Sequence, residues 1–246
     1  MLEYPVICDG NNHIKMDPHL DQQPTIILAS SSPRRRELLG LGGWRYRTIS
    51  APVDETLLVG EKPLQYVFRL AEAKAHAGAL QASPGGVVIS ADTIVVDVQS
   101  RSAGADELEI MGKPSSEEEA TKMLLHLRGH IHQVYTAIAV LQSGNGILYT
   151  DICATDVPMR NYSEVEIAAY VDSGDPFDKA GGYAIQHEEF RPVECLYGCY
   201  ANVVGLPLCH LARTLKKINI LPEVNIPIAC QHTLHFQCPV YKSIFL

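Results

Sequence analysis

Residues 25–43 read TIILASSSPRRRELLGLGG. Aliphatic and β-branched residues open this stretch and predict a short buried strand, after which three serines lead into a helical pattern. Ser32 is placed to cap the helix N-terminus, and Pro33 suits the first helical position. Two glycines at positions 42 and 43 predict the end of the helix. The stretch is therefore typical of a strand, a turn and a helix start in an α/β chain.

The first turn of this helix carries Arg34, Arg35 and Arg36, three positive charges against the positive end of the helix dipole. A bound anion would resolve this conflict, because free backbone N–H groups, serine hydroxyls and guanidinium groups all bind phosphate. The stretch thus predicts a phosphate or polyphosphate site. The alternative is that the arginines only point into solvent, as surface arginines commonly do.

Composition indicates an ordinary globular protein. The chain has 246 residues, 46% hydrophobic and 20% charged, which is enough to bury a full core. Its net charge of −8 argues against a nucleic-acid binder or a protein that binds anionic membranes, because either would be broadly basic. A phosphate site on this chain must therefore be a local basic pocket.

The chain shows no sign of export or membrane insertion. Its seven cysteines are odd in number and scattered, which favours free thiols in a reducing compartment. No signal peptide, organelle transit peptide or apolar run of about 18 residues is apparent. We therefore expect a cytoplasmic location and no membrane partner.

Three acids and one lysine stand out from the pattern. Asp92 interrupts the apolar strand VVISADTIVV (residues 87–96), where a carboxylate must be paired, bind a cation or cap a turn. Asp54 and Glu55 lie on a predicted loop, where acids are usually solvated. Lys74 lies beside the apolar stripe of a helix that begins at Pro63, so it either snorkels to solvent or reaches into a cleft.

The rest of the chain alternates strands and helices up to about residue 221. We expect strands at 45–49, 134–141, 147–149 and 153–160, and helices after two capping boxes, Ser116 to Glu119 and Ser163 to Glu166, and at 208–218. Residues 1–24 read as a loosely ordered extension, and the pattern dissolves after 221. The tail contains Cys230, His232, His235 and Cys238, whose short gaps are tight for zinc.

Several motifs in order make the chain resemble the Maf family, nucleotide pyrophosphatases once described as septum-formation inhibitors. They are LASSSPRRRELL, the acid pair at 54–55, RLAEAKA (69–75), ADTIV (91–95), GKP (112–114), HQVYT (132–136), DKAGGYAIQ (178–186) and NVVGLP (202–207). The resemblance covers about residues 25–220. We therefore expect a Maf-like domain at 25–221, with an extension at 1–24 and a tail of unknown role at 222–246.

The resemblance implies an α/β fold in which a mixed, curved sheet is flanked by helices, with two lobes, a central cleft and usually a homodimer. It also implies cleavage of a nucleoside triphosphate to the monophosphate and pyrophosphate with a divalent cation, Mg²⁺ or Mn²⁺. The segment DKAGGYAIQ resembles the branch of the family that cleaves dTTP and UTP, rather than the branch that acts on 7-methyl-GTP.

The site residues carry over by motif. They are Ser30, Arg34, Arg35, Lys74 and Lys113 for the phosphates, Glu55 and Asp92 for the cation and catalysis, and Thr93, Lys179 and Gln186 near the nucleotide. Two positions depart from the usual pattern: His187–Glu188 follows the IQ pair, and Cys199 replaces a more usual serine. Both could alter a loop beside the base.

Elementary chemistry agrees with this interpretation. A triphosphate carries about four negative charges, so cations from several segments with a divalent metal form a sensible clamp. One carboxylate, Asp92, would accept a proton from water that attacks the α-phosphorus. Gln186 offers a donor and an acceptor together, which matches uracil or thymine but not cytosine. The rival hypothesis is a non-catalytic nucleotide-binding regulator of cell division, which would have no use for a buried acid.

Overall fold

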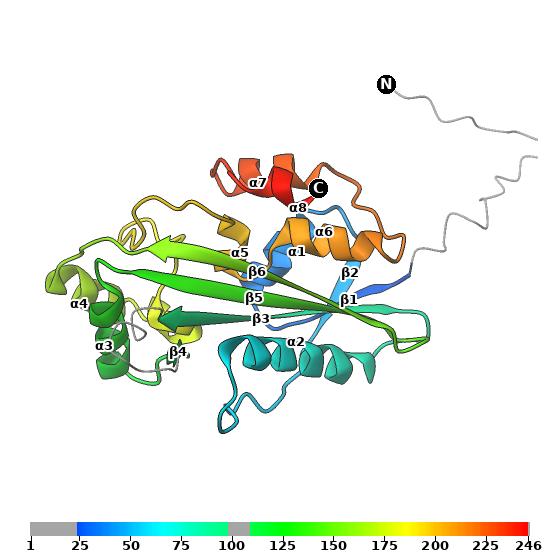
Figure 1. Ribbon diagram of the computed structural model, residues 1–246, viewed down its shortest axis with the longest axis horizontal. Coiled ribbons are helices and arrows are strands. Elements are labelled where there is room, and N and C mark those ends of the chain that lie inside the picture. Colours follow the sequence, from blue (N-terminus) through cyan, green and yellow to red (C-terminus); the bar gives the residue numbers. More distant parts are fainter. Residues whose placement is uncertain (1–23, 98–108, 246) are drawn as a thin grey trace, which may run out of the picture.

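The computed structural model of the protein describes residues 24–97 and 109–245. Six strands form one mixed sheet in the order β2-β1-β3-β5-β6, with β4 paired to β3 (Figure 1). β1 runs parallel to both β2 and β3, whereas β3, β5 and β6 are antiparallel neighbours. The strands are β1 (Ile26–Ala29), β2 (Tyr46–Ile49), β3 (Val87–Asp97), β4 (Glu109–Met111), β5 (Ile131–Gln142) and β6 (Leu148–Pro158). The predicted mixed sheet is confirmed.

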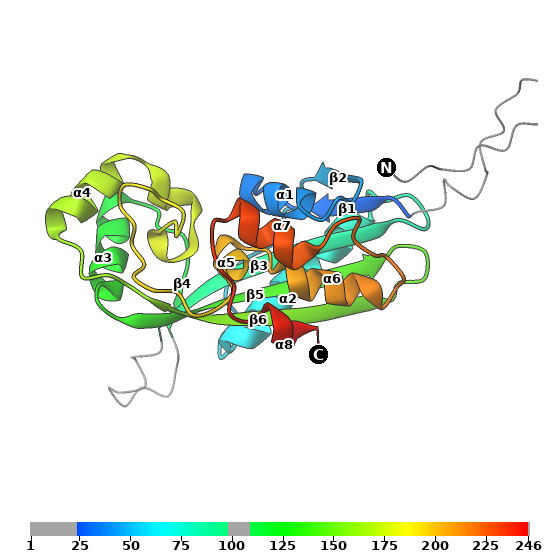
Figure 2. The ribbon, with the colours of Figure 1, turned by 90° about the horizontal axis from the view of Figure 1, so that it is seen from above.

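Helices cover both faces of the sheet and one end of it. The long helix α2 packs against one face and α1, α5 and α6 lie on the other, while α3 and α4 gather at the far end of β3 and β5 (Figures 1 and 2). The helices are α1 (Pro33–Gly40), α2 (Pro63–Ala79), α3 (Glu117–Leu127), α4 (Glu164–Asp172), α5 (Tyr200–Val204), α6 (Leu208–Lys216), α7 (Ile226–Thr233) and α8 (Tyr241–Ile244), with short 3-10 turns η2 (Asp175–Asp178) and η3 (Ala180–Gly182).

Strand alternation explains the two-sided core. Side chains on a strand point alternately to opposite faces, so Ile26 and Leu28 pack toward α6 while Ile27 packs toward α2. β3 follows the same rule, and nearly all of its residues are buried. In consequence Asp92 and Thr93, neighbours in the chain, project to opposite faces of the sheet. The predicted strand buried on both faces is confirmed.

The cleft between the lobes lies where one edge of β3 has no neighbouring strand. β5 pairs with β3 over residues 87–96, but on the other edge β1 pairs only as far as Ile89 and β4 begins only at Val95. Among the described residues, no strand fills the edge opposite residues 90–94. Asp92 lies in the middle of this gap, with β1 and α1 on one side and β4 and the 3-10 turns on the other.

The helix caps largely follow the sequence. Ser32 accepts the Arg35 N–H at 3.4 Å, and the capping box of Ser163 and Glu166 is complete. At α3 the second half of the predicted box is wrong: the Glu119 carboxylate accepts the N–H of Ser115 at 2.7 Å, and its hydroxyl, instead of the Ser116 N–H. The reason is that Ser115 offers two donors to the same oxygen.

Two expectations about regular structure are wrong. The strands expected at 147–149 and 153–160 are one strand, β6, because its pairing with β5 continues without a break. The chain after residue 221 also forms α7 and α8, whose Ile226 and Ile244 are 2% and 7% exposed in the main core. A four-residue helix and scattered apolar residues leave too little periodicity for the sequence to show this packing.

Within residues 24–97 and 109–245, the cysteines and histidines of the tail form no group of three whose ligand atoms lie close together. No helix in this part of the chain has both the length and the apolar character needed to cross a membrane.

Candidate active site

Two adjoining cavities open at the gap in the edge of β3. One has a volume of about 410 Å³ and the other, beside the loop after β1, about 360 Å³. Seven residues line both cavities: Ser32, Arg34, Arg35, Glu55, Lys74, Lys113 and Asp178. Asp92, Thr93, Lys179 and Gln186 line the first cavity, and Ser30 lines the second. The fold therefore brings all ten predicted site residues to one continuous hollow.

Lys74 joins the two predicted acids. Its Nζ lies 2.6 Å from Glu55 Oε1 and 2.6 Å from Asp92 Oδ1. The three side chains come from α2, from the loop before α2 and from β3, and they meet because Asp92 projects to the face that α2 covers. Only 13% of the Lys74 side chain and 9% of the Asp92 side chain are exposed. Lys74 thus reaches into the cleft, and the snorkelling alternative is wrong.

Electrostatics keep Glu55 ionised. Burial acts to raise its pKa, but the hydrogen bond and charge of Lys74, with smaller effects from Lys113 and Arg35, outweigh it and hold the pKa below the usual value for glutamate. The loop that carries Glu55 is itself fixed, since Tyr66 donates to the Glu55 carbonyl at 2.7 Å. Sequence reasoning missed Tyr66, although its position two helical turns before Lys74 on α2 places it on the same side of the helix.

Arg35 reaches the opposite face of β3. Its Nε donates to the Gly205 carbonyl at 2.8 Å and its guanidinium donates to Thr93 Oγ1 at 3.0 Å. Thr93 in turn lies 2.9 Å from the Thr136 hydroxyl on β5. Burial lowers the pKa of Arg35, with Asp92 acting in the opposite direction, yet a guanidinium remains charged at neutral pH. A fixed positive charge therefore faces the cavity at the start of α1.

The protein itself relieves part of the charge conflict at α1. Arg34 pairs with Asp178 at 2.9 Å, and Arg35 is held by neutral oxygens, whereas Arg36 is exposed and lines neither cavity. Only two of the three arginines thus face the cleft. An anion site at α1 would therefore use Arg34 and Arg35 but not Arg36, and a bound anion must compete with Asp178 for Arg34.

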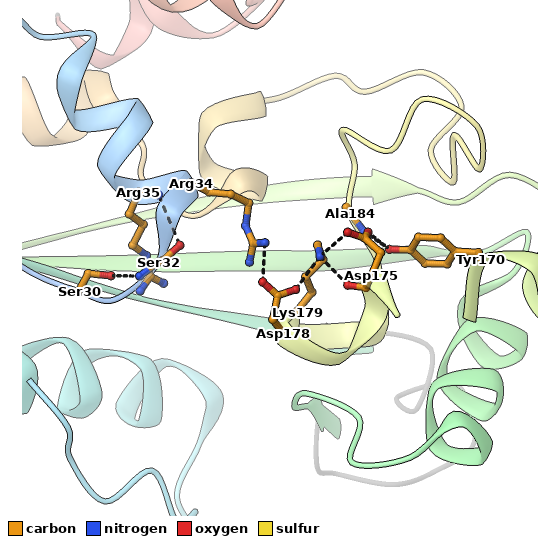
Figure 3. A network of polar contacts seen from close by, with 9 residues as sticks. All are labelled: Ser30, Ser32, Arg34, Arg35, Tyr170, Asp175, Asp178, Lys179 and Ala184. Atoms are coloured by element: carbon orange, nitrogen blue, oxygen red, sulfur yellow. Dashed lines mark hydrogen bonds and ion pairs between the residues drawn. The ribbon is translucent and has the colours of Figure 1, made fainter. Parts of the chain in front are cut away.

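The wall opposite α1 is a network of ion pairs (Figure 3). Lys179, which is 9% exposed, places its Nζ 2.6 Å from Asp178 and 2.9 Å from Asp175. Burial acts to raise the pKa values of both acids, but Lys179 together with Tyr170 at Asp175 and Arg34 at Asp178 outweighs it, and both values are lowered. Lys179 therefore has its charge balanced within the wall. Lys113 and Gln186, by contrast, are exposed and make no ion pair or hydrogen bond with the other described residues.

The donor set of Glu55 and Asp92 fits a divalent cation. One oxygen of each carboxylate lies 2.6 Å from Lys74 Nζ, so the point on which the two acids converge already holds an ammonium group, and a cation would take their other oxygens, which are hard ligands of the kind that Mg²⁺ and Mn²⁺ prefer. A separate group, Asp97, Glu109 and His126, is the one set of three in the described chain with ligand atoms close together. Sequence reasoning did not name it, and none of its members lines either cavity.

A cationic hollow with two carboxylates at its centre suits a polyanionic substrate. The chain belongs to the family described as Maf-like protein, which matches residues 25–218. Proteins named dTTP/UTP pyrophosphatase are similar over most of their length. One from Geotalea uraniireducens is 43% identical, with 82% of this chain and 99% of that protein covered. One from Thermomicrobium roseum is 41% identical over 88% of this chain and 94% of that protein.

A solved structure also resembles the chain at a distant level. The nucleoside-triphosphatase or dITP/XTP pyrophosphatase of Mycobacterium abscessus covers 80% of this chain and is covered completely, with 14% identity and a TM-score of 0.39. A similarity of this size adds nothing to the argument about the reaction, which depends on the site and on the family.

Proposed function

We propose that this protein hydrolyses dTTP and UTP to the monophosphate and pyrophosphate, clearing unwanted or modified nucleotides from the cell's pool. The observation that carries the proposal is the bridge of Lys74 between Glu55 and Asp92, in a cleft that Arg34 and Arg35 also line. A protein that only binds nucleotides needs the cations but not the buried acid. The names of the similar proteins support the same reaction.

The cations position the triphosphate. Arg34, Arg35 and Lys113 line both cavities, and Ser30 lies in the loop before α1, so phosphate oxygens can meet charged donors from two sides. A divalent metal held by Glu55 and Asp92 would supply charge neutralisation between the phosphates. Lys74 keeps these two carboxylates together and balances their charge.

Asp92 is the proposed general base. Its carboxylate accepts a proton from a water molecule whose oxygen forms a bond to the α-phosphorus, while the bond from that phosphorus to the bridging oxygen breaks. Pyrophosphate leaves with the bonding electrons. Because Asp92 Oδ1 already accepts from Lys74, the carboxylate is fixed in direction before the substrate arrives.

Gln186 is the proposed reader of the base. Its carboxamide lines the larger cavity and has no partner among the described residues, so both its donor and its acceptor are available. Uracil and thymine present an O4 acceptor beside an N3–H donor, and cytosine presents the opposite pattern. Once a bound base covers Gln186, a mismatched pair leaves polar groups of both partners unsatisfied, which is why such a site discriminates strongly.

A turnover assay tests the proposal. The full chain is incubated with UTP, dTTP, CTP, ATP or 7-methyl-GTP and Mg²⁺ or Mn²⁺, and pyrophosphate is scored against orthophosphate. We expect pyrophosphate, with UTP and dTTP preferred. Binding without turnover would favour the alternative, a regulator of cell division, and a preference for 7-methyl-GTP would place the chain in the other branch of the family.

The proposal includes a homodimer in the cytoplasm and a catalytic domain whose site residues all lie within 25–221, while α7 and α8 of the segment 222–246 pack on its core. The dimer, the location and the domain range follow from the family resemblance and from the cysteine pattern. Sedimentation equilibrium of the full chain tests the dimer, since a monomer at micromolar concentration would contradict it.

A further inference from the structure

Tyr170 lies behind the wall of the cleft and not in it. The residue belongs to α4, is 2% exposed and lines neither cavity. Its hydroxyl nevertheless accepts the backbone N–H of Ala184 at 2.9 Å and donates to Asp175 Oδ2 at 2.7 Å. Ala184, Ile185 and Gln186 are consecutive lining residues of the larger cavity. The hydroxyl of Tyr170 therefore holds the backbone two residues before the proposed base reader.

The ring of Tyr170 holds the other side of the same segment. It stacks on Phe190 with centroids 4.3 Å apart and planes 9° apart, and it meets His187 edge-on at 4.8 Å. His187 is itself fixed to Phe190, whose N–H donates to its Nδ1 at 3.0 Å. Gln186 thus lies between two points, Ala184 and His187, that both contact one buried tyrosine.

The hydroxyl also joins this segment to the charged part of the site. From Tyr170 the contacts run through Asp175 to Lys179, from Lys179 to Asp178, and from Asp178 to Arg34 on α1 (Figure 3). A phenol has one proton to donate, and here it is given to Asp175, so the Ala184 N–H meets an oxygen lone pair. Burial raises the pKa of Tyr170, which keeps that proton in place.

We infer that Tyr170 is a positioning residue for base selectivity: its hydroxyl fixes the Ala184 backbone so that the Gln186 carboxamide can pair with uracil or thymine. The inference rests on the proposed function and adds a residue that touches no part of the substrate. A loosened segment would let the carboxamide rotate or shift and accept cytosine, because the pairing depends on the direction of both its polar atoms.

The test is Tyr170→Phe, which removes the hydroxyl and keeps the stacked ring. We expect the ratio of kcat/KM for UTP to that for CTP to fall about tenfold, since one fixed hydrogen bond of the segment is lost. KM for UTP should rise while kcat stays within about threefold, because the groups at the phosphates are untouched. An unchanged ratio would overturn the inference, and so would an equal loss of activity toward both nucleotides.

Tyr162→Phe is the matched control. Tyr162 is equally buried, contacts the same Phe190 ring at 4.8 Å and donates its hydroxyl to the Leu124 carbonyl at 2.7 Å, away from the cleft. We expect Tyr162→Phe to lower the melting temperature about as much as Tyr170→Phe does. The ratio of kcat/KM for UTP to that for CTP should not change. If both variants lower the ratio alike, the effect is general loosening and the inference fails.

A double variant shows whether Tyr170 acts through Gln186. If it does, Tyr170→Phe should lower the ratio no further in a Gln186→Ala background, whereas independent effects would multiply and contradict the inference.

Hydrogen exchange keeps the inference separate from the proposed function. Tyr170→Phe should speed amide exchange at Ala184 relative to the original protein, whatever nucleotide is cleaved, and Tyr162→Phe should not. Exchange that stays slow at Ala184 refutes the anchoring even where UTP is cleaved. If Tyr170→Phe speeds exchange at Ala184 but the original protein releases no pyrophosphate, the hydrogen bond to Ala184 is supported and the proposed function is refuted. The role of Tyr170 in selectivity is then refuted as well.

Discussion

The two sides of the cleft are built differently. On the catalytic side, Glu55, Lys74, Asp92 and Arg35 come from four separate segments, and each is fixed by a partner from another segment. On the opposite side, residues 175–190 form one continuous stretch of 3-10 turns and loop. The first arrangement depends on the sheet and its helices, and the second on a few side chains behind it. In the proposed function, the chemistry thus depends on groups held together by several elements, and selectivity depends on one segment held by the side chains behind it.

Breaking the catalytic side should give the largest effect. Asp92→Asn keeps the shape of the side chain but can neither accept the proton nor balance a cation, so we expect kcat to fall about 10²–10⁴-fold. Pyrophosphate release under saturating UTP measures it. Asp54→Asn is the control, because Asp54 lies on the same loop as Glu55 but is exposed and accepts hydrogen bonds from its neighbour Thr56, away from Lys74. A folded Asp92→Asn protein with a normal rate would remove Asp92 from the mechanism.

Lys74→Met should give the next largest effect, about 100-fold in kcat/KM, the scale of losing a charge-assisted contact. Lys74 is what lowers the pKa of Glu55 against burial, so its removal should raise that pKa. Because the pKa of Glu55 is lowered in the folded protein, the ion pair of Glu55 with Lys74 stabilises the fold at neutral pH. This stabilisation is lost as the pH falls through the lowered pKa. The acid limb of kcat/KM against pH should therefore move to higher pH in the variant.

Lys122→Met is the control for this profile. Lys122 pairs with Glu118 at 2.7 Å, but both side chains lie on the exposed surface of α3. An acid limb that stays in place in Lys74→Met would show that Glu55 does not control it.

On the selectivity side, Gly181→Ala should raise KM for UTP about tenfold, with a backbone strain of roughly 1–2 kcal/mol. Gly181 has a φ of +71°, and a Cβ there would lie 3.0 Å from Val95 Cγ2, so either Val95 or the turn before Ala184 has to give way. Gly146→Ala is the control, because Gly146 has the same φ of +71° but open space around it in the β5–β6 turn. Equal KM values in the two variants would show that the wall tolerates displacement.

Removal of residues 222–246 should have the smallest effect on activity. Kinetics at 25 °C should change by less than about twofold, since the tail lines neither cavity, but two buried isoleucines contribute roughly 3–6 kcal/mol to folding at the usual value per side chain. Urea unfolding measures the loss. Where the shortened chain does not fold, Ile226→Ala reports the same packing. Loss of turnover in a folded variant would show that the tail supports one side of the cleft.

The sequence by itself determined the elements and the chemistry of this protein. The strand of residues 26–29, the Ser32 cap, the buried β3 with Asp92 in its middle and the family motifs all follow from local pattern, because periodicity and capping depend on neighbours in the chain. All ten site residues could be named from the sequence because each of the motifs that contain them is continuous in the chain.

Only the tertiary structure decided how those residues are paired. That Lys74 bridges two acids, that Asp178 competes for Arg34 and that Lys179 is balanced within the wall depend on which strand face meets which helix. Local sequence patterns likewise could not predict the packing of the tail or the contacts of Tyr170 behind the wall. Both involve segments that are separate in the sequence, and neither produces a periodic pattern of residues. How far a side chain is buried and which group it pairs with depend on contacts between segments that are distant in the sequence. These contacts form only when the strands and helices pack around the unpaired edge of β3 at Asp92.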